Sequence, residues 1–376
     1  MKRLVYADNA ATTQMDTDAF EAMKPYLLQE YGNASQRYSF ARQPKKAIQE
    51  ARETIASCIG ALPEEIFFTS GGTESDNWAI KGTAFRNYNH RATITTAFEH
   101  HAILHACESI ERLGYPVTYM WPDKDGQVSP ETLERYITDE TMLVSVMYAN
   151  NEIGSIQPIK DLCRVAHTHG ALFHSDAVQA VGHVEIDVND LGVDMLSASA
   201  HKFNGAKGVG FLFVRKGTQL FPYADGGAQE QGLRAGTENV AGIVSMAVAL
   251  RKNIENLLKN QQYIRDLEQR LIEQLSTNGI PFTRNGGINT LPGIISLSFP
   301  GASGEVILHR LDLMGVAVST GSACNSTRTE ISHVLSAIGL EESLAKGTIR
   351  ISLGKNNTTD DVDEIVQRLT KILMKG

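Results

Sequence analysis

Short apolar runs alternate with amphipathic stretches through the first two thirds of the chain. Residues 66–70 (IFFTS), 91–96 (RATITT) and 141–149 (TMLVSVMYA) have the apolar and β-branched composition of strands. The last of these runs is almost continuous, which is typical of a strand buried on both faces of a parallel sheet. Residues 74–85 and 101–114 have helical periodicity. This order predicts βαβ units, and therefore an α/β fold with a mainly parallel sheet.

The pattern changes near residue 238. Residues 238–277 form a long, helical and charged stretch, which indicates a connector helix or a pair of helices. Beyond it, apolar runs at 294–299 and 348–353 alternate with helical stretches. We therefore expect a large α/β unit followed by a smaller α+β unit.

Composition narrows the classes of function. The 376 residues carry 35 basic and 43 acidic side chains, and the net charge of −8 argues against direct nucleic-acid binding. No apolar run approaches the roughly 18 residues of a membrane span, and the N-terminus lacks the apolar core of a signal peptide. Four cysteines without a CxxC pair favour neither a disulfide framework nor a structural zinc site. We therefore expect a cytoplasmic protein that contacts neither nucleic acid nor membrane.

Two charged residues follow predicted core strands. Lys202 comes after the apolar run 195–200, and Asp176 lies at the end of the run 171–177. Ligands bind outside the carboxyl ends of strands in open α/β sheets. Pyridoxal 5′-phosphate requires such a pair: a lysine that forms a Schiff base with its aldehyde and a carboxylate that keeps its ring nitrogen protonated. The alternatives are a lysine that emerges into solvent and an aspartate that caps the next helix.

Further candidates fall at the same predicted edge of the sheet. The segment TSGGTES places Gly72 and Thr73 at a helix start, where backbone amides bind phosphate, although a simple turn is the alternative. His100 follows the strand 91–96 and could stack on the cofactor and move protons. His101 and His105 are spaced i, i+4, so a metal site is possible, but no third ligand is evident nearby.

Two more polar residues have open interpretations. Asn151, in ANNEIG, follows the strand 141–149 and could hydrogen-bond a ring substituent, but Asn-Asn also suits a turn. Arg350 lies within the apolar run 348–353. A buried arginine needs an anion, which is either a substrate carboxylate or an internal acidic partner.

One cysteine has unusual neighbours. Cys324 lies in STGSACNSTRTE (residues 319–330), among small and polar residues instead of the apolar neighbours of a core cysteine. The segment has the composition of an exposed loop, and it does not by itself explain why a thiol is placed there.

Together these stretches resemble the cysteine desulfurases of the nitrogen-fixation and iron–sulfur-cluster type, in the class V branch of fold-type I pyridoxal-phosphate enzymes. The matching pieces, which span nearly the whole chain, include YADNAATT, FTSGGTESDN, EHHA, HSDAVQA, SASAHKFNGAKGVG and STGSACNS. The resemblance implies a homodimer. Each subunit would have a large cofactor domain (residues 15–260) and a small domain (residues 1–14 plus 261–376) that carries the catalytic cysteine.

The same resemblance implies a reaction that moves sulfur from L-cysteine to Cys324 as a persulfide and releases L-alanine. It implies that Lys202 forms the Schiff base with the cofactor, that His100 stacks on the cofactor ring, and that Asp176 pairs with the ring nitrogen. The remaining implied contacts are Asn151 and Gln179 with the ring oxygen, Gly72, Thr73, Ser199 and His201 with the phosphate, Thr237 with the phosphate of the neighbouring subunit, and Asn33 and Arg350 with the substrate carboxylate.

The implied partner is a sulfur-acceptor protein of iron–sulfur cluster assembly or tRNA thiolation. No resident metal is expected, although Cys324 could transiently ligate an iron–sulfur cluster. Asn325 and Ala34 depart from the usual family pattern without removing a group that the chemistry needs.

Two rival interpretations remain. One is another class V enzyme, either an aminotransferase, which has no use for Cys324, or a selenocysteine lyase, which the sequence separates poorly. The other is a catalytically silent binding subunit, against which Lys202 and Asp176 argue.

Overall fold

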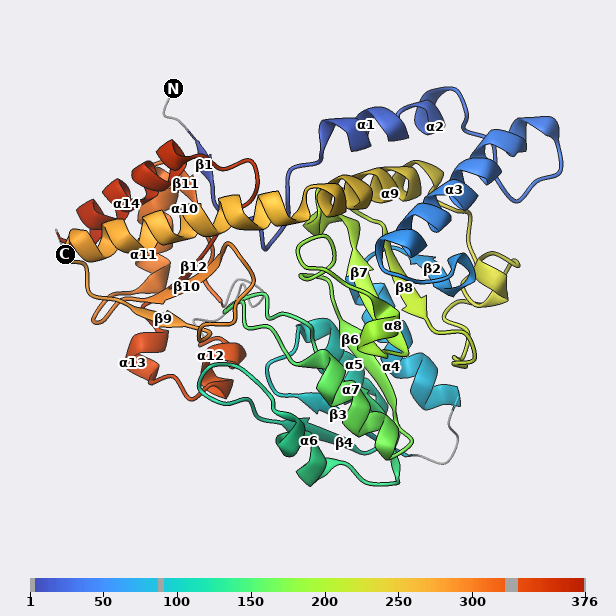
Figure 1. Ribbon diagram of the computed structural model, residues 1–376, viewed down its shortest axis with the longest axis horizontal. Helices are drawn as coiled ribbons and strands as arrows, with labels where there is room; N and C mark the ends of the chain where they lie inside the picture. Colours follow the sequence, from blue (N-terminus) through green and yellow to red (C-terminus); the bar gives the residue numbers. More distant parts are fainter. Residues whose placement is uncertain (1–3, 87–90, 322–330, 375–376) are drawn as a thin grey trace.

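The computed structural model describes residues 4–86, 91–321 and 331–374. Its largest element is a seven-stranded sheet (Figure 1). From one edge to the other, its strands are β2 (Ile66–Thr69), β8 (Gly210–Val214), β7 (Met195–Ser199), β6 (Leu172–Asp176), β5 (Thr141–Ser145), β3 (Ala92–Thr96) and β4 (Val117–Met120). Strand β8 runs in the direction opposite to the other strands of this sheet. The predicted α/β class is therefore confirmed.

Helices cover both faces of this sheet. Because successive side chains of a strand point to opposite faces, Leu143 and Val144 of β5 belong to different apolar clusters. The Leu143 cluster contains buried side chains of α4 (Gly72–Arg86) and α5 (His101–Glu111). The Val144 cluster contains those of α3 (Arg42–Cys58), α7 (Ile159–Thr168) and α9 (Val240–Glu255). The sheet is therefore the middle layer of three.

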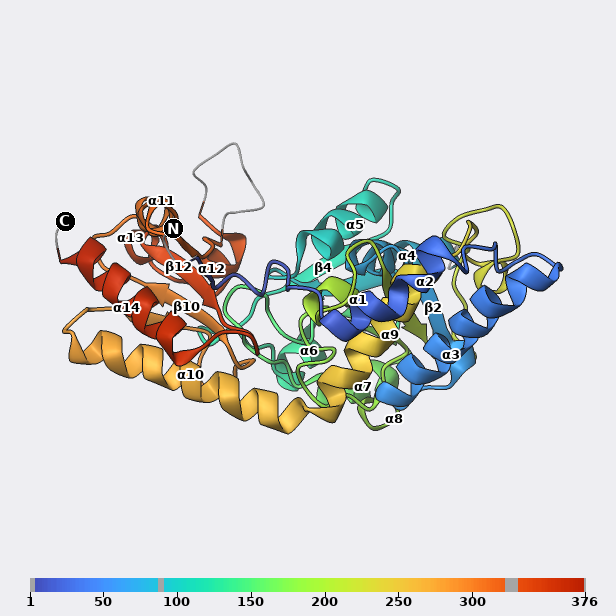
Figure 2. The same ribbon diagram turned by 90° about the horizontal axis from the view of Figure 1, so that it is seen from above.

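A smaller unit lies beyond the helix pair α9 and α10 (Leu257–Thr277), which runs across the molecule (Figures 1 and 2). The predicted connector is thus a pair of helices. The unit contains an antiparallel sheet, β12 (Thr348–Ser352), β10 (Ile294–Ser298) and β9 (Thr283–Asn285). It also holds the parallel pair β1 (Val5–Tyr6) and β11 (Val316–Ala317), so the N-terminal segment joins the C-terminal unit.

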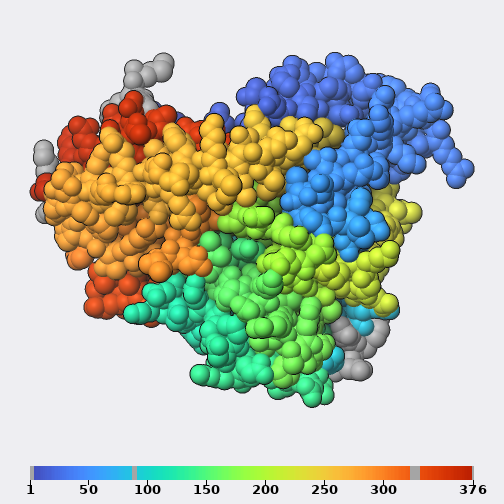
Figure 3. Space-filling model, viewed as in Figure 1, coloured from blue at the N-terminus to red at the C-terminus, as the bar shows by residue number. Residues whose placement is uncertain are grey.

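The smaller unit has an apolar cluster of its own, to which α10, α11 (Gly304–Leu313) and α14 (Thr359–Leu373) contribute. In contrast, α12 (His333–Ala337) and α13 (Glu342–Ala345) contribute buried side chains to the cluster of the larger unit. The space-filling view shows the two units in contact (Figure 3). The domain boundaries at residues 14/15 and 260/261 stay a prediction.

The remaining helices are short. They are α1 (Thr17–Met23), α2 (Pro25–Leu28), α6 (Pro130–Tyr136) and α8 (Val188–Leu191). Three of them, α1, α6 and α8, each add one buried side chain to the cluster of the larger unit. Within the described residues, no helix combines the length and the apolar character needed to cross a membrane.

The strands predicted at residues 66–70, 91–96 and 141–149 are present, but the last one is shorter than its apolar run. Strand β5 ends at Ser145, and Met147 and Ala149 line the cavity described below. The apolar run continues past the strand because these side chains remain buried. The apolar run therefore indicates which residues are buried and does not give the length of the strand.

We expect Phe173→Ala to lower the free energy of unfolding by about 3–5 kcal/mol, because Phe173 on β6 is fully buried and its loss leaves a cavity. Leu258→Ala is the control, since Leu258 is 79% exposed, and should change stability by less than about 0.5 kcal/mol. Urea unfolding followed by circular dichroism measures both. Equal stability of the two variants would contradict the placement of Phe173 in the core.

Candidate active site

A cavity of about 650 Å³ opens at the carboxyl ends of the parallel strands. Its size is typical of a site for a cofactor and a small substrate. Most of the residues that the sequence singled out line it, namely Gly72, Thr73, His100, Asn151, Asp176, Gln179, Ser199, His201, Lys202 and Arg350. Residues from five strand ends and from the smaller unit thus meet in one place.

Two predicted residues within the described part of the chain do not line this cavity, and a third lies outside that part. Asn33 is half-buried, and its side-chain oxygen accepts a hydrogen bond from the amide of Ser35. Thr237 is exposed and lines a separate, smaller cavity of about 110 Å³ that shares Ser70 with the main one. Cys324 lies outside the described residues.

The turn before α4 is shaped to admit an anion. Gly71 has a φ of +147°, a conformation that favours glycine, and the hydroxyl of Ser199 lies 3.4 Å from where a Cβ of Gly71 would be. A Cβ on Gly72 would lie 2.5 Å from a methyl group of Val178. Glycine at both positions therefore lets the start of α4 pack against Ser199 and Val178 at the cavity, and the first amides of a helix can bind phosphate.

Lys202 lies in the 3₁₀ turn Ala200–Lys202 that follows β7. Its Nζ donates hydrogen bonds to the carbonyl oxygens of Ala10, at 2.6 Å, and Ala11, at 2.9 Å. The amide of Gln179 donates to the Ala10 oxygen as well, at 2.9 Å. The N-terminal segment therefore holds both side chains at the cavity wall, and the lysine amine is within the cavity that a cofactor aldehyde would enter.

Three carboxyl groups are buried beside the cavity. Asp76, on α4, has one side-chain oxygen without a hydrogen-bond partner in the described structure, and so has Glu99. Asp76, His100 and Asp176 offer ligand atoms that all lie within 4.8 Å of one another. Two carboxyl groups this close in a buried site cannot both ionise without a large cost, so the charge of Asp176 favours the protonated form of Asp76.

Burial raises the pKa of all three carboxyl groups. Burial raises the pKa of Asp176 to about 6, although the amide of Val178 and the charge of Lys202 favour its ionised form. Burial, reinforced by Asp176, raises the pKa of Asp76 well above its ordinary value, and burial raises that of Glu99 to about 8. Asp176 is therefore the carboxyl group of the three most ready to be charged near neutral pH.

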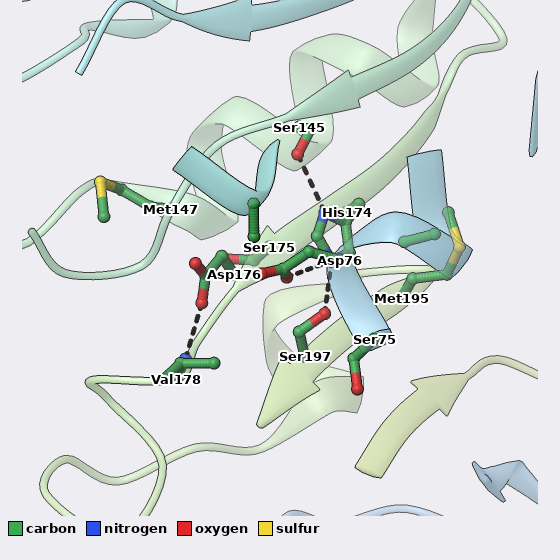
Figure 4. A network of polar contacts seen from close by, with 12 residues as sticks. Ser75, Asp76, Ser145, Met147, His174, Ser175, Asp176, Val178, Met195 and Ser197 are labelled. Atoms are coloured by element: carbon green, nitrogen blue, oxygen red, sulfur yellow. Dashed lines mark hydrogen bonds and ion pairs between the residues drawn. The ribbon is translucent and has the colours of Figure 1, made fainter. Parts of the chain in front are cut away.

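His174 belongs to the same network of buried polar residues as Asp76 and Asp176 (Figure 4). Its ring nitrogens lie 2.9 Å from the hydroxyls of Ser145 and Ser197, and Nε2 lies 3.9 Å from Asp76. Because the ring is fully buried, its pKa falls to about 3 and it stays neutral. His174, Ser145 and Ser197 are therefore neutral hydrogen-bonding neighbours of the buried carboxyl groups and add no positive charge to them.

His100 caps α5 and has its ring at the cavity. Its Nδ1 accepts a hydrogen bond from the amide of Ala102 at 3.1 Å, so the neutral ring carries its proton on Nε2. Burial, followed by the charge of Lys202, lowers the pKa of His100 to about 4. His100 is therefore neutral at physiological pH.

The other two histidines of this region do not complete a metal site. The rings of His101 and His105 stack with centroids 5.1 Å apart, and His333 lies 4.7 Å from His101. Among the described residues, however, this pair forms no three-ligand group as compact as Asp76, His100 and Asp176. The metal interpretation of the i, i+4 spacing therefore gains no support.

Arg350 has the internal acidic partner that was one of its two interpretations. Its Nη2 donates to Asp8 at 2.7 Å and its Nη1 to the carbonyl oxygen of Asn151 at 2.9 Å. Its Nε has no partner within the described part of the chain. Since Arg350 also lines the cavity, its bonds to Asp8 and Asn151 hold the guanidinium at the cavity wall.

Sequence reasoning missed four acidic residues of this region, which are Asp8, Asp76, Glu99 and Glu152. Asp8 follows a two-residue strand, which is too short to produce a pattern. Asp76 lies in a helix whose apolar and polar positions are not segregated, so nothing marked it as buried. Glu99 and Glu152 adjoin His100 and Asn151, and that proximity to candidate residues was the available signal.

The residues present fit pyridoxal phosphate. The cavity offers an amine, an amide-lined phosphate cradle, and a buried carboxyl group on β6 for the ring nitrogen. Each of these comes from a different strand end.

Comparisons with known proteins agree with this geometry. The family described as aminotransferase class-V matches residues 5–365. The chain is 48% identical to a cysteine desulfurase IscS of Dictyoglomus turgidum, over 100% of this chain and 96% of that protein. It is 46% identical to a cysteine desulfurase IscS of Methanosarcina thermophila, over 99% of this chain and 93% of that protein.

Solved structures are similar over most of their length. A NifS-like protein superposes with a TM-score of 0.94 at 38% identity, over 100% of both chains. A structure described as SspA in complex with cysteine superposes with a TM-score of 0.84 at 38% identity, over 94% of this chain and 100% of that one. Since the match extends over nearly every residue that forms the cavity, the chain belongs to the class V aminotransferase family of pyridoxal-phosphate enzymes.

Proposed function

We propose that the protein is a cysteine desulfurase that removes sulfur from L-cysteine, releases L-alanine and passes the sulfur to an acceptor. The observation that carries this proposal is the meeting of Lys202, Asp176 and the Gly71–Gly72 turn in one cavity. Relatives named cysteine desulfurase, matched over the full chain, support the choice of substrate. A structural neighbour solved with cysteine supports it too.

Bound pyridoxal phosphate would supply electron withdrawal from the substrate Cα. Lys202 would bind its aldehyde carbon, and the Nζ amine would then move the proton at Cα. Asp176 would hold a proton on the ring nitrogen, and His100 would stack on the ring. Asn151 and Gln179 would bind its ring oxygen, and Gly72, Thr73, Ser199 and His201 its phosphate.

The substrate would be held by its carboxylate. Arg350 is the candidate anchor because its guanidinium is oriented by Asp8 and lines the cavity. Asn33 would be a second contact with the same carboxylate. An arginine that binds in bidentate fashion fixes the plane of a carboxylate as well as its position.

Sulfur transfer would use Cys324 and no outside oxidant. The Cys324 sulfur forms a bond with the substrate Sγ while the Cβ–Sγ bond breaks. The electron pair of that bond stays on Cβ, which takes a proton and becomes the methyl group of L-alanine. Cys324 is left as a persulfide, and the outer sulfur passes to an acceptor, which we propose to be a cytoplasmic protein of iron–sulfur cluster assembly or tRNA thiolation.

We further propose a homodimer in which Thr237 reaches the phosphate of the neighbouring subunit. Thr237 is exposed, and its cavity shares Ser70 and Gly208 with the main one. Large apolar side chains between residues 20 and 40 are also exposed, which supports an interface there. They are Phe20, Leu27, Leu28, Tyr31, Tyr38 and Phe40.

Cys324→Ala should keep its cofactor absorbance and lose at least about 100-fold in alanine and sulfide release from L-cysteine with a reductant present, because the nucleophile is gone. Wild type should release the two products in equal amounts. Lys202→Ala is the matched control, since it should lose the chemistry together with the covalent cofactor linkage. Unchanged turnover of Cys324→Ala would leave Cys324 without a role and favour a lyase.

Protonation of His100 should not lower kcat/KM near pH 6.5, the ordinary pKa of a histidine. His100 is neutral above about pH 4, since burial disfavours its charged form, so its protonation limits activity only below that value. His100→Gln should therefore be roughly 100-fold slower with the same profile between pH 5 and 8. A wild-type acid limb near pH 6.5 that disappears in His100→Gln would contradict this assignment.

Subunit mixing tests Thr237. Thr237→Val should bind the cofactor roughly 10-fold to 100-fold more weakly, because a hydrogen bond to a charged group is lost. A dimer of one Thr237→Val and one Lys202→Ala subunit has one intact site if Thr237 acts across the interface. Cofactor binding and alanine release should then recover to about half of wild type in the isolated mixed dimer, and to about a quarter after random equimolar mixing, in which about half of the dimers are mixed. No recovery, or a monomer in sedimentation, would refute the shared site.

A further inference from the structure

Glu152 occupies a rigid turn at the edge of the active-site cavity. Its amide donates to the side-chain oxygen of Asn150 at 2.8 Å, and the Asn150 amide group donates to the carbonyl oxygen of Phe98 at 3.0 Å. Glu152 is only 7% exposed and lines the cavity. The turn therefore holds the carboxyl group in one place relative to the larger unit.

Two segments of the chain, before and after residues 322–330, meet at this carboxyl group. The hydroxyl of Ser332 donates to Glu152 Oε2 at 2.5 Å. Gly321 packs so closely against the same oxygen that a Cβ there would collide with it, and a Cβ would also lie 2.8 Å from that of Ser332. The two ends of the segment that contains Cys324 therefore converge on one buried side chain.

Each end has a second attachment that does not involve Glu152. Before the segment, Ser319 and Arg350 exchange backbone hydrogen bonds of 3.0 and 2.7 Å. After it, His333 Nε2 lies 2.9 Å from the carbonyl oxygen of Glu99 and donates to it. Glu99 precedes His100, an expected cofactor ligand, and Arg350 is an expected substrate ligand, so both attachments are made at the candidate site.

Ser332 connects Glu152 to the next helix as well. Its hydroxyl oxygen accepts the amide of Val334 at 3.1 Å and so caps α12. Because one hydroxyl both donates to Glu152 and caps the helix, the carboxyl group fixes the start of α12. Burial raises the pKa of Glu152 to about 7, with Ser332 and Arg350 opposing, but either form can hold the hydroxyl, since a carboxylate accepts and a carboxylic acid donates.

We propose that Glu152 is a positioning residue that fixes both ends of the Cys324 segment against the cofactor cavity. This inference rests on the proposed function, in which Cys324 attacks the substrate. Glu152 acts through Gly321 and Ser332 and does not touch the reacting atoms. Its loss should slow the step that needs Cys324, because misplacement by about 1 Å can cost 100-fold in rate, and should spare cofactor binding.

The test compares Glu152→Ala and Glu152→Gln as holoenzymes with wild type. Three quantities are measured, namely cofactor absorbance, alanine formed from L-cysteine per turnover, and the rate at which iodoacetamide alkylates Cys324, read by peptide mass spectrometry. Cys107 and Cys163, which are buried, are internal references for the last measurement. Glu65→Gln is the matched control, since Glu65 is equally buried and bonded to the amides of Leu62 and Lys216 away from the cavity.

Glu152→Ala should keep its cofactor, form alanine at least about tenfold more slowly, and show a changed Cys324 alkylation rate. Glu152→Gln should recover most of the rate, because its amide can still bond Ser332, and Glu65→Gln should match wild type. Wild-type alanine formation and alkylation in Glu152→Ala would overturn the inference. So would equal losses in the Ala and Gln variants.

If Glu152→Ala does not fold, Ser332→Ala replaces it under the same criteria. The proposed function and this inference can fail separately. Wild type that forms no alanine, or an active Cys324→Ala, would refute the function, whereas the alkylation rates still report on the anchor. Active wild type with inactive Cys324→Ala and unimpaired Glu152→Ala and Ser332→Ala would refute the inference alone.

Discussion

The free-energy cost of removing carboxyl groups from water determines which of them are charged beside the cavity at the carboxyl ends of the strands. Asp176 is buried beside Asp76 and Glu99, and Lys202 supplies the nearby positive charge that favours its ionised form. Lys202 favours the charge of Asp176, and ionising a second buried carboxyl group beside it would cost more free energy. Asp76 and Glu99 therefore keep their protons. The amide of Val178 and the charge of Lys202 favour the ionised form of Asp176, so Asp176 is the carboxyl group that would be charged beside a protonated ring nitrogen.

The smaller unit contributes to this balance from outside the sheet. The segment after β1 brings Asp8 to Arg350 and the Ala10 carbonyl to Lys202 and Gln179. The position of the lysine amine therefore depends on residues almost two hundred positions away. Packing of the two units, and not the strand end alone, gives the cavity its polar lining.

The sequence predicted the parts of this arrangement that leave a local pattern. Strands with continuous apolar composition, the glycine turn at Gly72 and charged residues at strand ends such as Lys202 all follow from local chemistry. Asp8 and Glu152 could not be predicted in the same way, because their partners, Arg350 and Ser332, are distant in the sequence. The two interpretations of Arg350 likewise could be separated only by seeing which anion lies beside it.

The antiparallel strand β8 has a consequence for how this protein can vary. Because β7 and β8 pair directly, with Ser199 opposite Gly210, the lysine lies on a short return between adjacent strands and not on a helical crossover. A Cβ on Gly210 would collide with the carbonyl of Ala198, so the return is packed at its end as well. Because both strand ends are paired, a residue inserted in this return would have to be absorbed within residues 200–209 and would move the Lys202 amine away from the carbonyl oxygens of Ala10 and Ala11. Changes of chain length are therefore costly next to the lysine.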